Sequence, residues 1–183
     1  KKGLTKMKIG ICTCGVFNPP LHNQMDYVSV TDRIKAAYCK KFGHEFISSK
    51  ENAHEDRDAH FARFALLLYA LAKLECDWVI WMDCDAAPVN FNVDIADFLS
   101  KMEPDKVVIR KDVLGWNSGV FAVPRTEKAI NWLLSLDSQE TYDKFVKARF
   151  QDQDAIAASF EHPDFKDFFQ IPPDGFGFNQ YDN

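Results

Sequence analysis

The sequence predicts an α/β fold in which a mostly parallel central sheet is flanked by helices. Short apolar runs alternate along the chain with longer segments whose apolar residues recur at helical spacing. One run, residues 78–82, is apolar at every position, which is typical of a parallel strand covered on both faces. We therefore expect a doubly wound arrangement of strands and helices.

The first half of the chain predicts three strands with two helices between them. Residues 7–12 form an apolar strand that runs into turn formers, and residues 23–42 follow as a helix with Gly43 at its C-cap. Residues 44–48 predict the second strand. Residues 56–75 contain a helix that is apolar on nearly every face, and the strand at 78–82 comes next.

The second half is less regular. Residues 106–110 and 120–123 predict strands, and residues 126–136 predict a helix with Thr126 as its N-cap. The remaining segments are expected to be two helices at 139–150 and 153–160, a short strand at 168–171 and a loop at 172–183. No repeat or linker divides the sequence, so we expect residues 1–183 to form one domain, which can be a segment of a longer protein.

Composition and charge exclude several classes of protein. The chain is 46% hydrophobic and 27% charged, as in ordinary globular proteins. Its net charge of −5 argues against nucleic-acid binding, which depends on clustered Lys and Arg. No apolar run is long enough for a membrane segment. The odd number of cysteines, five, predicts a reducing compartment, and we expect a cytoplasmic protein without a zinc site.

One Asp-x-Asp triplet follows directly after the buried strand at 78–82. In α/β sheets, ligands bind beyond the carboxyl ends of the strands. Two carboxylates at such a place need a cation, and oxygen ligands suit Mg²⁺ or Mn²⁺ together with substrate phosphates. If the extended geometry continues, both side chains point the same way. The alternative is that they cap a turn. The candidate metal ligands are Asp83 and Asp85, and the other two triplets begin at Asp56 and Asp152.

Two further polar clusters are candidates for sugar contacts. Asn117, Ser118 and Gly119 lead into a strand, where Gly119 permits close approach and the Asn117 amide can bond to hydroxyls; an ordinary loop is the alternative. Asp152 and Gln153 begin a small helix, and a carboxylate there can steady a developing oxocarbenium ion. The alternative for Asp152 is helix capping.

The order of these motifs resembles retaining nucleotide-sugar glycosyltransferases of the GT-A fold, which is Rossmann-like. The resemblance is to the Golgi galactosyl- and mannosyltransferases with the plant xylosyltransferases and, more distantly, to the glycogenin and lipopolysaccharide galactosyltransferase group. It extends from Lys8 to about Tyr181 and lies in the ordered set of motifs. Residues 33–46, with Tyr38 and the stretch 42–45, also look like the early helix and strand of the first group.

The resemblance implies a role for each motif. Asp85 would bind Mn²⁺ or Mg²⁺ directly, and Asp83 would contact the metal or the donor's ribose. Asp152 and Gln153 would lie near the reaction centre. A third metal ligand, a His, would follow the region that here is residues 179–181, whereas His162 is expected to be a surface residue. The other implied donor contacts are Cys12, Thr13, Arg63, Asn117, Ser118, Gly119 and Asp154.

The expected function is transfer of a sugar from a nucleoside diphosphate donor to a hydroxyl of a glycan or glycoprotein. A UDP-sugar is favoured as donor, and a GDP-sugar is the alternative. Two other functions stay open at this stage: a phosphatase of the haloacid-dehalogenase type with Asp83 as nucleophile, and a module that binds a nucleotide sugar without turnover. The resemblance also adds the Golgi lumen as an alternative compartment if the chain is cut from a membrane-anchored protein.

Overall fold

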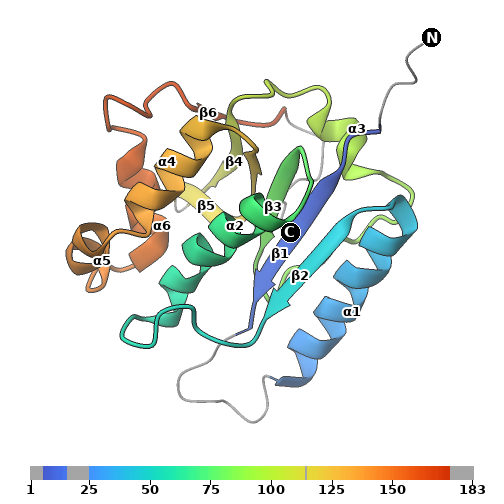
Figure 1. The fold of residues 1–183 in the computed structure, drawn as a ribbon, viewed down its shortest axis with the longest axis horizontal. Coiled ribbons are helices and arrows are strands. Elements are labelled where there is room, and N and C mark those ends of the chain that lie inside the picture. The colour runs from blue at the N-terminus through green and yellow to red at the C-terminus, as the bar shows by residue number, and fades with distance from the viewer. Residues whose placement is uncertain (1–5, 16–24, 114, 174–183) are drawn as a thin grey trace.

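A computed structural model of the chain describes residues 6–15, 25–113 and 115–173 (Figure 1). These residues contain a six-stranded sheet in the order β2-β1-β3-β5-β4-β6. β1 pairs in parallel with β2 and β3, and β4 pairs in parallel with β6, whereas β5 is antiparallel to both β3 and β4. The mostly parallel sheet is therefore confirmed. The strands are β1 (Ile9–Cys14), β2 (Glu45–Ser49), β3 (Trp78–Met82), β4 (Val107–Asp112), β5 (Gly115–Pro124) and β6 (Phe169–Gln170).

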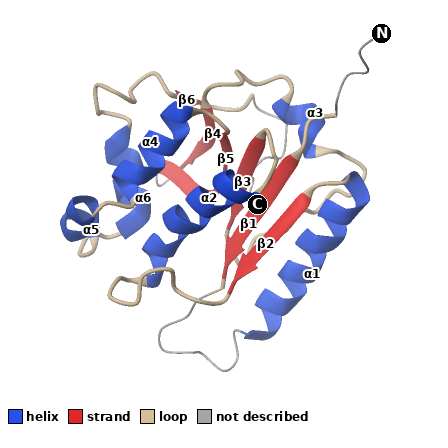
Figure 2. Cartoon of the chain, viewed as in Figure 1, coloured by secondary structure: helices blue, strands red, loops and turns tan. Residues whose placement is uncertain are grey.

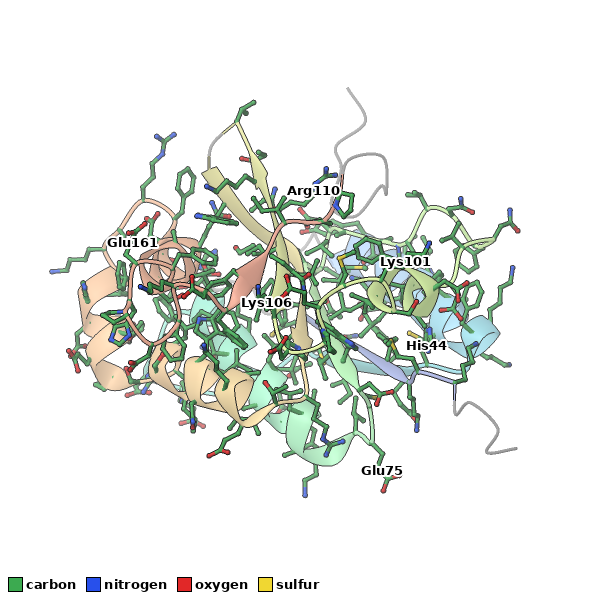
Figure 3. The ribbon with its side chains drawn as sticks, turned by 90° about the horizontal axis from the view of Figure 1, so that it is seen from above. His44, Glu75, Lys101, Lys106, Arg110 and Glu161 are labelled. Atoms are coloured by element: carbon green, nitrogen blue, oxygen red, sulfur yellow. The ribbon has the colours of Figure 1, made fainter. Side chains whose placement is uncertain are left out.

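Helices cover both faces of the sheet (Figure 2). One part of the core lies beneath α2, α4 and α6, and the other lies beneath α1 and α3. Figure 3 shows His44, which follows α1, and Glu161, which follows α6, well apart on the two sides of the molecule. The helices are α1 (Met25–Phe42), η1 (Ala59–Phe61), α2 (Ala62–Lys73), α3 (Ile95–Leu99), α4 (Glu127–Leu136), α5 (Gln139–Phe145) and α6 (Gln151–Ser159).

The alternation of side chains along β3 explains why this strand is apolar throughout. Trp78 and Ile80 pack in the α1 and α3 part of the core, whereas Val79 and Trp81 pack in the α2, α4 and α6 part. Successive strand residues point to opposite faces, so a strand covered on both sides needs apolar residues at every position. This is the arrangement that the sequence predicts.

Several local predictions are confirmed by the structure. Gly43 follows the end of α1 with a φ of 75°, a conformation that glycine adopts without the penalty of a Cβ atom. Thr126 is the N-cap of α4, and its side chain accepts a hydrogen bond from the Ala129 N–H. The boundaries of α4 and of the strands other than β5 lie within a few residues of those expected.

Residues 56–75 contain the expected helix, α2, which begins at Ala62 after the turn η1; the Asp58 side chain accepts a hydrogen bond from the His60 N–H and caps η1. Two other helices differ from the prediction. The helix expected over 139–150 ends at Phe145. Helix α3, which the periodicity does not reveal in five residues, is capped by Asp94. Residues 174–183 of the predicted terminal loop lie outside the described residues.

The polar segment 116–119, expected to be a loop, lies inside β5. Its residues pair with β4, with Asn117 opposite Arg110 and Trp116 opposite Lys111, across an irregularity in the register after Ile109. β5 also lies beside β3, with Val120 opposite Met82. Because β5 runs antiparallel, its amino half reaches the carboxyl end of β3. This reversal brings Asn117, Ser118 and Gly119 to the edge where the Asp-x-Asp motif begins.

Candidate functional site

The Asp83-Cys84-Asp85 segment leaves the sheet in a tight turn. The Asp83 N–H donates to the Gly119 carbonyl at 2.8 Å and so continues the pairing of β3 with β5 by one residue. The chain then reverses, and the Ala86 N–H donates to the Asp83 carbonyl at 3.0 Å. The extended geometry therefore does not continue to Asp85, so the condition under which strand alternation would point both carboxylates the same way is not met. Asp85 is exposed.

Arg63, in the first turn of α2, connects three motifs that are far apart in the sequence. Its Nη1 donates to the Ser118 carbonyl at 3.0 Å and to the Ser118 hydroxyl at 3.1 Å, and its Nη2 donates to Asp83 Oδ1 at 3.2 Å. Its Nε lies 2.8 Å from Asp152 Oδ2. The side chain is only 9% exposed. A buried cation near a helix N-terminus is unfavourable by itself, so the two carboxylates are needed to stabilise it.

The Asp83 carboxylate is held on one oxygen and still reaches solvent. Oδ1 accepts hydrogen bonds from Trp81 Nε1 at 2.6 Å and from Arg63. Trp81 and Asp83 are two residues apart, so the strand period places both side chains on the α2 face. The Arg63 guanidinium carbon also lies 4.9 Å from the centre of the Trp81 ring. The Asp83 side chain is 34% exposed, which leaves it accessible to a ligand.

Asp152 lies at the start of α6 with its carboxylate against Arg63. Phe150 is the N-cap of this helix and makes no side-chain hydrogen bond, so helix capping does not explain the position of Asp152. The side chain is 5% exposed. Burial raises the pKa of Asp152, and the positive charge of Arg63 opposes this shift. Gln151 just before it has a φ of 39°, a strained conformation of the kind that clusters at functional sites.

The contact between Arg63 and Asp152 is an ion pair without an aligned hydrogen bond. Although Nε and Oδ2 are close, both atoms are buried and neither has a hydrogen-bond partner of good geometry. The attraction between the two charges therefore stabilises this contact more than a well-aligned hydrogen bond does. This leaves Asp152 as a buried carboxylate whose hydrogen-bonding capacity is only partly used at the carboxyl end of the sheet.

The other predicted sugar-contacting residues lie beside this pair. Gln153 Oε1 accepts from the Ser118 N–H and hydroxyl, each at 3.2 Å. Asn117 Oδ1 accepts from the Gly119 N–H at 2.8 Å. The structure thus brings the β5 and α6 motifs together. Their roles toward a donor stay predictions, as does that of Asp154, whose Oδ2 accepts from the Phe150 N–H at 2.9 Å.

Cys12 and Thr13 at the end of β1 are fully buried. Cys12 packs in the core beneath α2, where burial raises the pKa of its thiol. The Thr13 hydroxyl accepts a hydrogen bond from Lys35 Nζ at 3.3 Å. A donor contact through either side chain would require this packing to open. Their donor-binding role stays a prediction, and with these side chains buried it would depend on their backbone groups.

Some residues that the motifs do not reveal also contact the Asp-x-Asp segment, among them Trp81 and Lys35. Trp81 donates to the Asp83 side chain, and Lys35 Nζ donates to the Asp83 carbonyl at 3.0 Å. Burial lowers the pKa of Lys35. The sequence does contain a sign that Lys35 is buried. It lies seven residues after Val28 and three before Tyr38, on the buried face of α1, where an apolar residue is expected. A buried indole N–H likewise needs a partner.

The side chains that remain for a metal are the two carboxylates of the turn. The described residues contain no group of three or more His, Cys, Asp or Glu side chains that could hold a metal ion. His162 follows α6 as an exposed residue, as expected, and residues 179–181 lie outside the described part of the chain. Asp83 and Asp85 still fit Mg²⁺ or Mn²⁺, because these ions use one or two carboxylates and complete their shell with water and substrate phosphates.

None of the described helices has both the length and the hydrophobicity required to cross a membrane. No protein-family model matches the sequence, and no curated protein matches it significantly.

The structure is similar to solved structures of glycosyltransferases. It superposes on a glycosyltransferase involved in the glycosylation of the major capsid of PBCV-1 with a TM-score of 0.71 and 18% identity, over 89% of this chain and 80% of the other. For apo GlyE of Streptococcus pneumoniae TIGR4 the TM-score is 0.55 at 15% identity, over 92% and 46% of the two chains. For mouse xyloside xylosyltransferase 1 the values are 0.51 and 12%, over 90% and 85%. At these identities the likeness concerns the fold, and the chain has the GT-A fold of these glycosyltransferases.

Proposed function

We propose that this chain transfers a sugar from a nucleoside diphosphate donor to a hydroxyl of a glycan or glycoprotein, with retention of configuration. The observation that carries the proposal is the convergence of Asp83, Ser118 and Asp152 on the single guanidinium of Arg63. This cluster lies at the carboxyl end of β3, where α/β sheets bind their ligands. The likeness of fold to glycosyltransferase structures supports the same function.

In this proposal the diphosphate of the donor lies beside Asp83 and Asp85. A Mn²⁺ or Mg²⁺ ion held by these carboxylates would stabilise the negative charge of the leaving diphosphate. Arg63 orients Asp83 through Oδ1, so that the rest of the carboxylate faces the open side of the turn. A pair of unit charges about 4 Å apart is worth roughly 4 kcal/mol at an effective dielectric of 20, which is about three factors of ten in affinity.

The sugar of the donor is proposed to lie between β5 and the start of α6. Asn117, Ser118 and Gln153 offer amide and hydroxyl groups there, and Asp152 adds a buried carboxylate. A carboxylate close to the anomeric carbon stabilises the positive charge that develops as the glycosidic bond breaks. Arg63 holds Asp152 in place, and its positive charge opposes the rise in the pKa of Asp152 that burial causes. We favour a UDP-sugar as donor, with a GDP-sugar as the alternative.

The contacts of Asp83 argue against a phosphatase that uses this residue as nucleophile. One carboxylate oxygen accepts hydrogen bonds from both Trp81 and Arg63, which withdraw negative charge from the group. These hydrogen bonds occupy one of the two carboxylate oxygens and hold the group in one orientation. These contacts suit a carboxylate that orients the donor better than one that attacks phosphorus.

The metal role predicts that Asp85→Ala folds normally but loses metal-dependent donor binding. The exposed Asp85 side chain contributes little to stability, whereas the loss of one carboxylate from a two-carboxylate site should weaken binding by about 100-fold. The measurement is thermal stability with UDP- and GDP-sugars, with and without Mn²⁺. A ligand at 100 times its Kd stabilises the native state by about 2.7 kcal/mol, so the wild-type shift is easily seen.

Asp56→Ala is the matched control for this experiment. Asp56 belongs to a second Asp-x-Asp triplet but lies in an exposed turn before η1, and does not directly follow a strand. Its replacement should leave the Mn²⁺-dependent shift unchanged. Undiminished Mn²⁺-dependent binding by Asp85→Ala would remove this residue from the metal site.

A further inference from the structure

A buried lysine on α1 holds the Asp83-Cys84-Asp85 turn from the face of the sheet opposite to Arg63. Lys35 is completely buried, and its ammonium donates to the Asp83 carbonyl at 3.0 Å and to the Thr13 hydroxyl at 3.3 Å. Burying an ammonium group is costly unless it is well paired. The Asp32 carboxylate lies only 3.9 Å away and offsets part of this cost. The backbone carbonyl of the Asp-x-Asp motif is thus one of the two hydrogen-bond acceptors of this ammonium.

A second side chain of α1 contacts the next carbonyl of the same turn. The Thr31 hydroxyl donates to the Cys84 carbonyl, and also contacts the Val28 carbonyl of its own helix at 3.1 Å. Thr31 and Lys35 are four residues apart and therefore lie on one face of α1. The Asp83 and Cys84 carbonyls are consecutive, and they accept hydrogen bonds from side chains one helical turn apart on α1. The backbone between Asp83 and Asp85 is fixed to α1 before any ligand arrives.

We propose that Lys35, assisted by Thr31, is a positioning residue that presets the Asp83-Cys84-Asp85 turn for binding of a divalent cation with a nucleoside diphosphate. This inference rests on the proposed function for its ligand, and on the hydrogen bonds of Lys35 and Thr31 for its geometry. Neither residue touches the ligand. Each acts through the backbone that carries the two carboxylates.

The physical reason is the entropy of the turn. Asp85 is exposed, and the Ala86 N–H to Asp83 carbonyl bond is the backbone contact that closes the turn. Arg63 and Trp81 still hold the Asp83 carboxylate when the Lys35 and Thr31 contacts are lost. The backbone after Asp83, and with it the Asp85 carboxylate, would then sample many positions relative to Asp83, and metal binding would have to order it. A misplacement of about 1 Å can cost 100-fold at a reacting site. We expect the loss to appear in metal and donor affinity, since ordering by bound ligand restores the geometry at saturation.

Lys35→Met tests the proposal because methionine keeps most of the apolar stem and removes the ammonium group. Lys40→Met, at an exposed position on the same helix, is the control. Hydrogen exchange is measured first, without ligand, on the amides of residues 83–86. Lys35→Met should exchange at least about tenfold faster there, as the loss of about 1.4 kcal/mol of local stability implies, while β3 and α2 exchange as in the wild type.

The second readout is the Mn²⁺ concentration that half-saturates UDP-sugar binding. It should rise about tenfold in Lys35→Met, with donor turnover at saturating Mn²⁺ within about threefold of wild type. Thr31→Val should also speed hydrogen exchange at residues 83–86 and raise the half-saturating Mn²⁺ concentration, each by a smaller factor. If Lys35→Met does not fold, Thr31→Val alone tests the proposal. Unchanged exchange at residues 83–86 would overturn the inference. A wild-type protein that binds no nucleotide sugar would instead contradict the proposed function, and the exchange result would still decide the role of Lys35 in holding the turn.

Discussion

Replacement of Arg63 by methionine is expected to abolish sugar transfer and to lower the free energy of unfolding by about 3–5 kcal/mol. The guanidinium is buried and is the ion-pair partner of both Asp83 and Asp152. Removing one member of a buried ion pair leaves an uncompensated charge, and costs of this size are typical. The Ser118 carbonyl and hydroxyl would also lose a donor. No other single change among the site residues disconnects all three motifs at once.

Denaturant unfolding and donor turnover measure the two parts of this prediction. Lys73→Met is the control, because Lys73 is an exposed basic residue in the last turn of the same helix. Asp152→Asn in the Arg63→Met background should recover part of the lost stability, since it neutralises the orphaned carboxylate. Stability within 1 kcal/mol of wild type together with normal turnover would mean that the ion pairs of Arg63 do not organise the site.

Asp152→Asn is expected to reduce turnover by about 100- to 1,000-fold with little change in nucleotide affinity. Asparagine has nearly the same shape and is about as good at a helix N-terminus, so a role limited to helix capping would tolerate it. It lacks the negative charge that would stabilise a cationic transition state, and removal of one such contact typically costs this factor. A group that acts mainly in the transition state lowers the rate without weakening ground-state binding.

The measurement for Asp152→Asn is sugar transfer or donor hydrolysis at saturating donor and Mn²⁺, with nucleotide affinity determined separately. Arg63 keeps Asp83 as a charged partner in this variant, so the loss of stability should be smaller than in Arg63→Met. Asp143→Asn, an exposed position on α5, is the control. Near wild-type turnover would exclude Asp152 from the reaction centre and leave Gln153 or Asp154 as the candidate.

The fold could be predicted from the sequence because its signals are local. The apolar run of β3, the glycine after α1 and the Thr126 cap each depend on neighbours within a few residues. The direction of β5 could not be predicted, because its pairing with β3 and β4 joins segments tens of residues apart. For the same reason the 116–119 segment reads as a loop in the sequence and is a strand in the structure.

The site was predictable as a set of residues but not as a set of contacts. The order of the motifs names Arg63, Asp83 and Asp152, and the structure brings them together. The roles of Lys35 and Trp81 depend on how α1 and α2 pack against opposite faces of the sheet, which no local pattern encodes. The apolar pattern of β3 likewise does not show that the chain turns directly after Asp83, before Asp85 can continue the strand.

The most direct test of the proposed sugar transfer is to incubate the protein with UDP- or GDP-sugars, with Mn²⁺ or with a chelator, and to measure release of the nucleoside diphosphate by chromatography. A metal-dependent glycosyltransferase should release the nucleoside diphosphate and the sugar, or form its transfer product, only when the metal is present, and should release no phosphate from an aryl phosphate. Metal-dependent binding of the donor without any release would indicate a binding module. Phosphate release from the aryl phosphate, lost in Asp83→Asn, would show a phosphatase and contradict the account.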